Sequence, residues 1–349
     1  MSSPRPLTAR ARLVAVLTQE ILQNPESGSY AIASEHQLCR QYNISRVTVR
    51  LALSDLENRG LIFRKHGKGT FAHGRGSRSY RNIGLLTKTA HDGEHRPVSE
   101  LCRGIQTILA PLRSGLLVIT TPPEEWRPEM ASTLGGVVVL PEEITASDLQ
   151  VIRDRNIPYF ILGESDLPGP YILMGEREAA RKMTTDLLEL GHRQIAILSG
   201  YDLMMDERKR LGVYDALQAA GIDPKSVPEF SAKGKQSEIY RAANDVLNAN
   251  PRPTGVVAFD DSLGVILGFH ARKDFGLKVP DDLSIVSFHE WPFINFVEPA
   301  LTTVQFDFFN AGQRAAEALN QAALTGQPLE SLSFTPTYRV GQSLAAVAG

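Results

Sequence analysis

The chain has 349 residues, of which 42% are hydrophobic and 22% are charged, and its formal net charge at pH 7 is −2. This is ordinary globular composition, and the length suffices for two or three domains of roughly 100–200 residues each. The sequence contains no run of about 18 apolar residues, so no transmembrane helix is predicted. Residues 1–12 lack the apolar core of a signal peptide. Cys39 and Cys102 lie far apart in unlike contexts, which is typical of reduced thiols. We therefore expect a cytoplasmic protein.

The charges are unevenly distributed along the chain. Residues 1–80 hold 12 of the 37 Lys and Arg residues but 5 of the 39 Asp and Glu residues, so this segment has a net charge of +7 and the remainder has −9. A basic segment attached to an acidic body indicates a polyanionic partner for the smaller part, such as nucleic acid. A basic surface without a partner is the alternative reading of the charge alone.

Two helices are predicted at the start of the chain. The first covers about residues 8–23, and the apolar residues that share one of its faces are Leu13, Val16, Leu17 and Ile21. The second covers 35–42, because Ser34 is a favourable N-cap residue and Gln37 stands where a capping box requires it. Asn43 and Ile44 then form a tight turn.

A third helix is predicted between the N-cap Ser45 and the stop at Gly60, although its first residues include a β-branched run that favours a strand. Apolar residues at helical spacing decide for the helix: Val49, Ala52, Leu53 and Leu56. The opposite face carries Arg46, Val47, Arg50 and Ser54, with Thr48 at its edge. A helix–turn–helix whose second helix presents a basic face with short side chains has the geometry that enters the major groove of DNA.

A hairpin is predicted directly after this helix, in the segment LIFRKHGKGTFAHG. Leu61, Ile62 and Phe63 form a strand, residues 64–69 form a basic turn that contains glycine, and Thr70 and Phe71 lead back. This is the wing of a winged helix, and a basic tip suits contact with phosphate or the minor groove.

The segment IASEHQLCRQYNISRVTVRLALSDLENRGLIFRKHGKGTF resembles the winged helix of GntR-family bacterial regulators. The resemblance covers about residues 8–72 and departs at Ala33, where the family usually has proline, and at His36, where arginine is common. It implies that the following residues contact operator DNA: His36, Arg46, Val47, Thr48, Arg50, Lys65, His66 and Lys68. The departure at His36 leaves part of the operator sequence undetermined.

The body of the chain follows a Gly-, Ser- and Arg-rich linker at 73–81. Strands are predicted at 82–87, 116–121, 135–140, 158–163, 194–200, 254–261 and 283–290. Helices are predicted between them at 98–112, 146–155, 176–190, 207–220, 236–249 and 262–275. Near-continuous apolar runs are expected for parallel strands that are covered on both faces, so we predict a doubly wound α/β body with two subdomains.

Several segments of the body, in the same order, resemble the LacI/GalR-type effector domain, which is itself similar to periplasmic sugar-binding proteins. The most specific are DLLELGHRQIAILSG, PRPTGVVAFDDSLGVILG and PALTTVQ. The resemblance implies a periplasmic-binding-protein-like fold with a small effector, usually a sugar or sugar derivative, in its cleft. The subdomain crossovers are expected near 160–165, 288–293 and 320–327. With the GntR-type head, the architecture resembles that of arabinose-repressor-type regulators: a DNA-binding domain at 1–72, a linker at 73–81, and an effector-binding and dimerisation domain at 82–349.

The same resemblance implies a set of effector-binding residues: Asp261, Lys209, Arg208, Arg210, Glu176, His289 and Trp291. Asp261 matches the family aspartate that bonds sugar hydroxyls, and Lys209 stands where the family has arginine. Because a lysine is not a planar fork, either neighbouring arginine could take that role. Structural roles are the alternatives: a helix-capping Asp261, surface charges at 208–210, a Glu176 stabilised at a helix N-terminus, and a Trp291 packed at the crossover.

Together these features predict a homodimeric repressor of carbohydrate-utilisation genes that binds pseudo-palindromic double-stranded DNA and responds to a sugar-like effector. The alternative is a DNA-binding regulator whose body binds a non-sugar metabolite or serves only for dimerisation. No glycine fingerprint follows a strand, and GKGT lacks the Walker spacing. We therefore predict no enzymatic activity, catalytic residues, metal or cofactor. The sequence leaves open the effector, the operator, the regulated genes, and whether the effector releases or promotes DNA binding.

Overall fold

The structure is a computed structural model that describes residues 8–24, 29–65, 67–73, 81–87, 96–112, 114–141, 144–200, 204–232, 236–288, 294 and 296–347. It divides into two compact units. Unit 1 consists of Met1–Leu162, Asp166–Tyr171 and Phe308–Leu332, and unit 2 consists of Gly163–Ser165, Ile172–Asp307 and Ser333–Gly349. None of the described helices combines the length and the apolar character needed to span a membrane.

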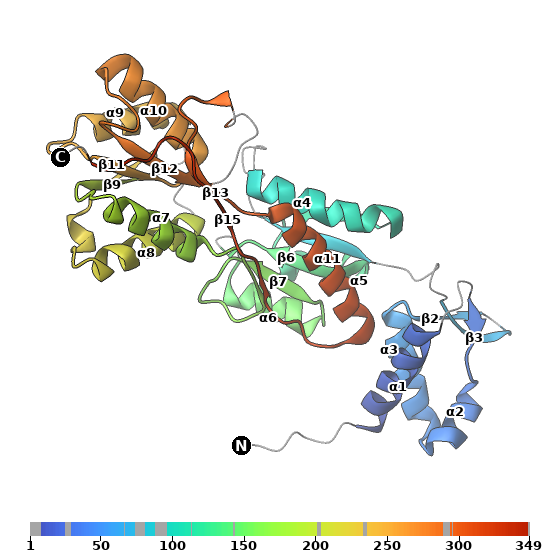
Figure 1. Ribbon diagram of the computed structural model, residues 1–349. Coiled ribbons are helices and arrows are strands. Elements are labelled where there is room, and N and C mark those ends of the chain that lie inside the picture. The colour runs from blue at the N-terminus through green and yellow to red at the C-terminus, as the bar shows by residue number, and fades with distance from the viewer. Residues whose placement is uncertain are drawn as a thin grey trace. The chain divides into compact units, whose positions relative to one another are not determined.

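The N-terminal part of unit 1, called the head, is a winged helix-turn-helix (Figure 1). Its elements are α1 (Ala9–Gln23), β1 (Tyr30–Ala31), α2 (Glu35–Tyr42), α3 (Arg46–Asn58), β2 (Ile62–Lys65) and β3 (Gly69–Ala72). The strands form an antiparallel sheet in the order β1-β3-β2. The winged helix-turn-helix predicted from the sequence is therefore confirmed.

Local signals in the sequence explain where the helices of the head begin. Ser34 and Gln37 form the predicted capping box of α2, and Ser45 caps α3 through the backbone N–H of Thr48. Between them Asn43 takes a left-handed conformation with φ 49°, which asparagine tolerates. The expectation that Val16 lies on the buried face of α1 was wrong. Val16 is 38% exposed, and Val14 is buried in the core instead.

The rest of unit 1 is a layered α/β structure. Its strands are β4 (Asn82–Leu86), β5 (Leu116–Ile119), β6 (Leu134–Val139), β7 (Tyr159–Leu162), β8 (Tyr171–Leu173) and β14 (Leu332–Ser333). Its helices are α4 (Arg96–Leu109), α5 (Pro128–Ser132), α6 (Ala146–Asp154) and α11 (Phe308–Thr325). The sheet order is β14-β8-β7-β6-β4-β5, and β5, β4, β6 and β7 pair in parallel. Figure 1 shows α4 and α11 on one face of the sheet and α6 on the other.

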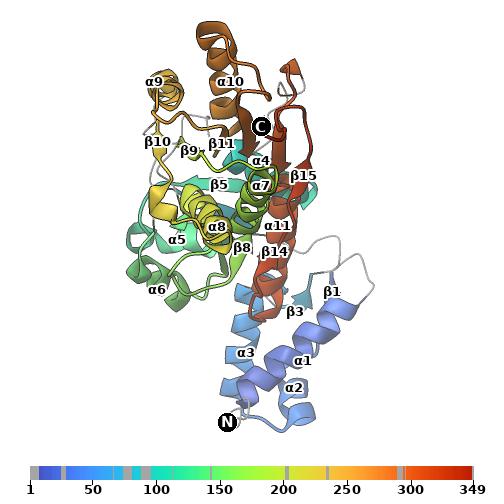
Figure 2. The same ribbon diagram turned by 60° about the vertical axis from the view of Figure 1, so that its left-hand side comes forward.

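Unit 2 repeats this plan with a second sheet. Its strands are β9 (Ile195–Ser199), β10 (Glu229–Ser231), β11 (Gly255–Ala258), β12 (Ser284–Phe288), β13 (Thr302–Gln305) and β15 (Thr337–Arg339). Its helices are α7 (Glu176–Glu189), α8 (Met204–Ala219), α9 (Gln236–Leu247) and α10 (Asp261–Phe275). The order is β10-β9-β11-β12-β13-β15, and among the described strands of this sheet only β15 is antiparallel to its neighbour. Helices α7 and α8 cover one face, and α9 and α10 cover the other (Figure 2). The predicted doubly wound α/β body is confirmed.

The chain passes from one unit to the other at 162–172, 307–308 and 332–333. The second and third passages lie beyond the ranges expected from the sequence, 288–293 and 320–327. The second is later because β13 still pairs with β12 in unit 2. The third is later because α11, which is absent from the predicted helices, packs along its length in unit 1.

Helices α4 and α11 cross with their backbones in direct proximity. A Cβ atom at Gly104 would lie 2.0 Å from the carbonyl oxygen of Phe309, and one at Gly312 would lie 2.1 Å from the carbonyl oxygen of Leu101. Real Cβ atoms do not approach backbone so closely, so this crossing requires glycine at both positions.

Replacing Gly312 by Ala is expected to push α11 away from α4 and to destabilise unit 1 by about 1–3 kcal/mol, as over-packing does. Urea unfolding measures the change. Gly268→Ala in α10 is the matched control, since its new Cβ would meet Ile285 Cδ1 at an ordinary 3.5 Å. An unchanged unfolding midpoint for Gly312→Ala would contradict the close crossing.

Candidate nucleic-acid interface and effector site

Helix α3 divides into a buried face and an exposed face. The buried residues Val49, Ala52, Leu53 and Leu56 are all 0% exposed. On the other side Val47 is 68% exposed, and the side chains of Arg46 and Arg50 are 71% and 58% exposed. Thr48 is partly buried, and its hydroxyl lies 2.8 Å from Ser45 Oγ at the helix start. The exposed face therefore presents two guanidinium groups on either side of a short apolar side chain, a combination that suits contact with base edges in the major groove.

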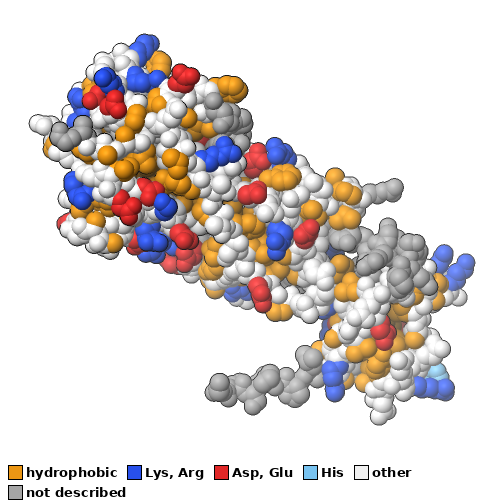
Figure 3. Space-filling model, in the orientation of Figure 1, with side chains coloured by type: hydrophobic (Ala, Val, Ile, Leu, Met, Phe, Trp, Pro, Cys, Tyr) orange, Lys and Arg blue, Asp and Glu red, His pale blue; other side chains and the backbone are white. Residues whose placement is uncertain are grey.

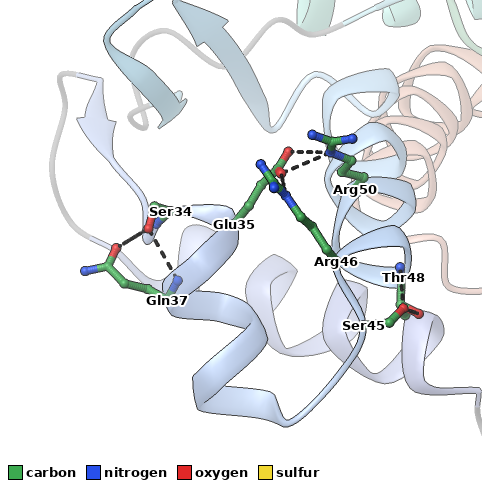
Figure 4. A network of polar contacts seen from close by, with 7 residues as sticks. All are labelled: Ser34, Glu35, Gln37, Ser45, Arg46, Thr48 and Arg50. Atoms are coloured by element: carbon green, nitrogen blue, oxygen red, sulfur yellow. Dashed lines mark hydrogen bonds and ion pairs between the residues drawn. The ribbon is translucent and has the colours of Figure 1, made fainter.

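The two arginines of α3 share one acidic partner on α2 (Figure 4). Arg46 Nε donates to Glu35 Oε2 at 3.2 Å, and Arg50 Nε donates to the same oxygen at 3.0 Å. Partial burial by itself would raise the pKa of Glu35, but the hydrogen bonds and charges of the two arginines hold it below its ordinary value. Glu35 is thus ionised at neutral pH and links the two helices of the helix-turn-helix.

The wing places basic side chains at the tip of a tight hairpin. Lys65 at the end of β2 pairs in register with Gly69 at the start of β3, and Lys68 N donates to Lys65 O at 2.9 Å. Gly67 and Gly69 have φ values of 70° and 108°, which other residues rarely adopt. Both lysine side chains are exposed. His66, predicted to contact DNA, lies outside the described residues.

His36 is the remaining predicted DNA contact, and it lies exposed on the first turn of α2. It therefore belongs to the helix that carries Glu35. In the space-filling view, Lys and Arg side chains stand out on the head, where little acidic surface is visible (Figure 3). The predicted contacts that the structure describes thus lie on three exposed parts of the head: the start of α2, the outer face of α3 and the wing.

In unit 2, Lys209 is the predicted effector residue with the most unusual surroundings. It is 2% exposed, and its Nζ donates to the carbonyl oxygen of Phe259 at 2.7 Å and lies 3.4 Å from Asp206 Oδ1. Lys209 Nζ also lies 5.8 Å from the ring centroid of Phe259 and 5.3 Å from that of Phe288. Phe259 directly follows β11, and Phe288 is the last residue of β12. Lys209 therefore holds a buried charge at the carboxyl ends of these parallel strands.

Asp261 is fully buried at the first position of α10. Its Oδ1 accepts hydrogen bonds from Ser287 Oγ at 2.8 Å and from Thr303 Oγ1 at 3.1 Å. The carboxylate thus joins β12, near the carboxyl end of that strand, to β13, and the carboxyl ends of the strands are where an open α/β sheet binds ligands. Asp261 therefore has a structural role in this conformation, but it is not the helix-capping role of the structural alternative, because Asp260 caps α10.

The other effector candidates occupy different surroundings. Glu176 begins α7 and is 6% exposed. Burial raises the pKa of its carboxyl group, and this effect outweighs the hydrogen bond from its own backbone N–H and the charges of Lys209 and Arg208, which lower the pKa. Arg208 pairs with Glu164 at 2.8 Å. Arg210 makes a bidentate pair with Glu229 at 2.7 Å, and this pairing raises its pKa. The two arginines are therefore engaged by surface carboxylates, whereas Glu176 and Lys209 are buried near each other. His289 and Trp291 lie outside the described residues.

Comparisons with known proteins match the head and the C-terminal half of the chain to two different families. Residues 10–72 match the gntR family of bacterial regulatory proteins, and residues 184–344 match a periplasmic binding protein-like domain. The chain is 26% identical over 329 residues to the arabinose metabolism transcriptional repressor of Geobacillus stearothermophilus, with 87% of this chain and 89% of the relative covered.

Solved structures show the same fold. A LacI family transcriptional regulator from Enterococcus faecium with bound ribose superposes with a TM-score of 0.66 at 20% identity, over 77% of this chain and 100% of that chain. The transcriptional regulator CelR in complex with cellobiose gives a TM-score of 0.64 at 18% identity, over 97% of this chain and 100% of that chain. At these identities the similarity concerns the fold alone.

Sequence reasoning missed the polar residues that act as partners of the predicted ones. Glu35 was not singled out, although its place directly after the N-cap Ser34 fixes it on α2 beside the start of α3. Asp206, Ser287 and Thr303 were also missed. Asp206 stands one helical turn before Lys209, a spacing that favours an ion pair and could have found it. The two hydroxyls have no such signal, since only strand pairing brings them to Asp261.

Replacing Asp261 by Ala is expected to destabilise unit 2 by roughly 1–3 kcal/mol, because the hydroxyls of Ser287 and Thr303 lose a buried acceptor. Chemical denaturation tests this. Asp281→Ala removes an exposed carboxylate from the same unit and should change stability little. Equal stability of both variants would show that the buried hydrogen bonds of Asp261 contribute nothing.

Proposed function

We propose that this chain, which carries a GntR-type helix-turn-helix domain and a periplasmic-binding-protein-like domain, is a sequence-specific DNA-binding repressor of carbohydrate-utilisation genes. A small sugar-like effector controls its affinity for operator DNA. It acts in the cytoplasm, and the function requires no catalytic group, metal or cofactor. The head comprises residues 1–72, the linker 73–81, and the effector-binding and dimerisation domain 82–349.

The observation that carries this proposal is the exposed basic face of α3. Arg46 and Arg50 are exposed while the opposite side of the helix is completely buried, so the arginines and Val47 face a partner. Guanidinium groups bond guanine O6 and N7 or phosphate, and short side chains allow close approach to base edges. The remaining proposed contacts are His36, Thr48, Lys65, His66 and Lys68.

The proposed effector site lies at the carboxyl ends of the strands in unit 2. Lys209, Glu176 and Asp261 form its buried polar part, and His289 and Trp291 remain candidates from the sequence. Arg208 and Arg210 are weaker candidates because carboxylates already engage them. The ribose- and cellobiose-bound structures of the same fold support a sugar-like ligand.

The proposed active species is a homodimer that binds a pseudo-palindromic operator. Two identical heads can then occupy successive major grooves on one face of the duplex. We expect the body to have two conformations that differ in operator affinity. An effector that binds one of them more tightly shifts the equilibrium between them, by at most the difference in its binding free energy for the two conformations.

Two experiments test the function. The full-length protein should retard DNA from upstream of its own gene in a gel-shift assay, and failure to do so would refute the proposal. A thermal-shift screen against pentoses, hexoses, uronates and their phosphates should identify an effector that also changes the gel shift. If only a non-sugar metabolite raised the thermal midpoint, the proposed sugar-like effector would be wrong, and the effector would belong to that other class of ligand.

Arg50→Ala is expected to weaken specific binding by roughly 1–3 kcal/mol and to relax the base preference at one operator position. Fluorescence anisotropy with the operator and single-base variants measures both effects. Lys225→Ala removes one exposed positive charge outside the head and serves as the control. Unchanged affinity for Arg50→Ala would remove this residue from the interface.

Lys68→Ala is expected to weaken binding to all duplexes about equally, because the wing lysine is assigned to phosphate. The slope of log K against log salt should fall by about 1. A salt titration with specific and scrambled duplexes tests this, and a change in base preference would instead assign Lys68 to base reading.

A further inference from the structure

The proposed DNA interface contains an acidic residue that the predicted contact set omits. Glu35 is the first residue of α2, and its carboxylate accepts from the Nε atoms of Arg46 at 3.2 Å and Arg50 at 3.0 Å. Its side chain is 24% exposed, against 71% and 58% for the two arginines. Figure 4 shows the three side chains converging between α2 and α3. One largely covered carboxylate thus supports two outward arginines.

The position of Glu35 is fixed by the start of α2. Ser34 N donates to Gln37 Oε1 at 2.8 Å, and Gln37 N donates to Ser34 Oγ at 3.3 Å, which closes the capping box. Leu38, on the next turn, is buried in the core of the head. The positive end of the helix dipole also favours a carboxylate at this position. Glu35 is therefore held in place by the fold of the head itself.

The arginine atoms that pair with Glu35 leave the terminal nitrogens available. Arg46 and Arg50 both donate to Glu35 through Nε, and no group among the described residues bonds their Nη atoms. Two guanidinium groups four residues apart on a helix repel each other, and each long side chain samples many rotamers. A shared carboxylate opposes both effects, so the Nη atoms are presented in a restricted arrangement.

We propose that Glu35 is a positioning residue that holds Arg46 and Arg50 as one donor set and thereby determines operator selectivity rather than general DNA affinity. The inference rests on the DNA-binding function proposed above. A carboxylate near the duplex repels phosphate and weakens binding to every sequence. Its favourable effect comes from pre-organised donors, which matter only where the bases match. The two effects have opposite signs and can be measured separately.

The test compares the full-length wild type with Glu35→Gln, which keeps the side-chain size and removes the charge. Dissociation constants are measured at one salt concentration for the duplex that the wild type selects from a random-sequence pool and for a scrambled duplex. We expect their ratio, the selectivity, to fall roughly tenfold, which is at the lower end of what one bidentate contact contributes. Binding to the scrambled duplex should stay the same or tighten.

Glu20→Gln is the charge-matched control in the head. Glu20 accepts a hydrogen bond from the Tyr42 hydroxyl and none from α3 among the described contacts, so its removal should leave selectivity at the wild-type value. In an Arg50→Ala background, the effect of Glu35→Gln should shrink, because one of the two side chains through which it acts is absent. These two results would support the proposal.

Three outcomes would overturn it. The first is an unchanged selectivity for Glu35→Gln. The second is a full tenfold loss that persists in the Arg50→Ala background, since Glu35 would then contact DNA directly, for example a cytosine amino group. The third is a parallel loss of binding to both duplexes with a lower thermal midpoint, which marks a purely structural role. A wild type that selects no sequence from the pool would refute the proposed function itself, and it is recognised before any variant is compared.

Discussion

The complete burial of one stripe of α3 is the constraint on which the organisation of the head depends. Burying a valine or leucine side chain contributes about 1.5–3 kcal/mol, whereas the helix penalty of a β-branched residue is below about 0.7 kcal/mol. Burial of Val49, Leu53 and Leu56 therefore outweighs the strand preference of the residues at the start of the helix. Once this stripe faces inward, the period of the helix requires Arg46 and Arg50 to face outward.

The helices of the head could be predicted from sequence because each signal is local. Ser34, Gln37 and Ser45 mark helix starts, and an apolar period marks the buried face. The partnership between Glu35 and the α3 arginines could not be predicted in this way. It depends on the angle between α2 and α3. The tight turn at Asn43 sets this angle, and no pattern of residue types predicts it.

The body shows the same limit on a larger scale. Apolar runs predicted β4, β5, β6, β7, β9, β11 and β12. They did not predict β8 and β13, which lie inside the sheets, the edge strands β10, β14 and β15, or the helix α11. The likeness to a known family pointed to Asp261 and Lys209, and both proved to be buried. Their bonding partners come from other strands and helices, so the difference between a ligand-binding carboxylate and one that joins two strands appears only in three dimensions.

These buried polar groups give the strand ends of unit 2 a defined arrangement. Asp261 accepts from hydroxyls on two neighbouring strands, and Lys209 donates to the carbonyl that follows a third. Polar groups in such a place are stable only when their hydrogen bonds are made. A ligand that binds there competes for, or adds to, hydrogen bonds that already hold the strand ends together.

The crossing of α4 and α11 also affects the order in which the chain can fold. Gly104 and Gly312 lie at the same helix crossing, but more than half of the chain separates them, and this interval contains most of unit 2. During synthesis α4 emerges early and has no partner for the face that α11 will cover. Unit 2 can form most of its sheet before that partner exists, whereas the α/β part of unit 1 must wait for almost the last stretch of the chain. A chain cut short before residue 308 would therefore have an uncovered face on α4 in unit 1 and a largely complete unit 2.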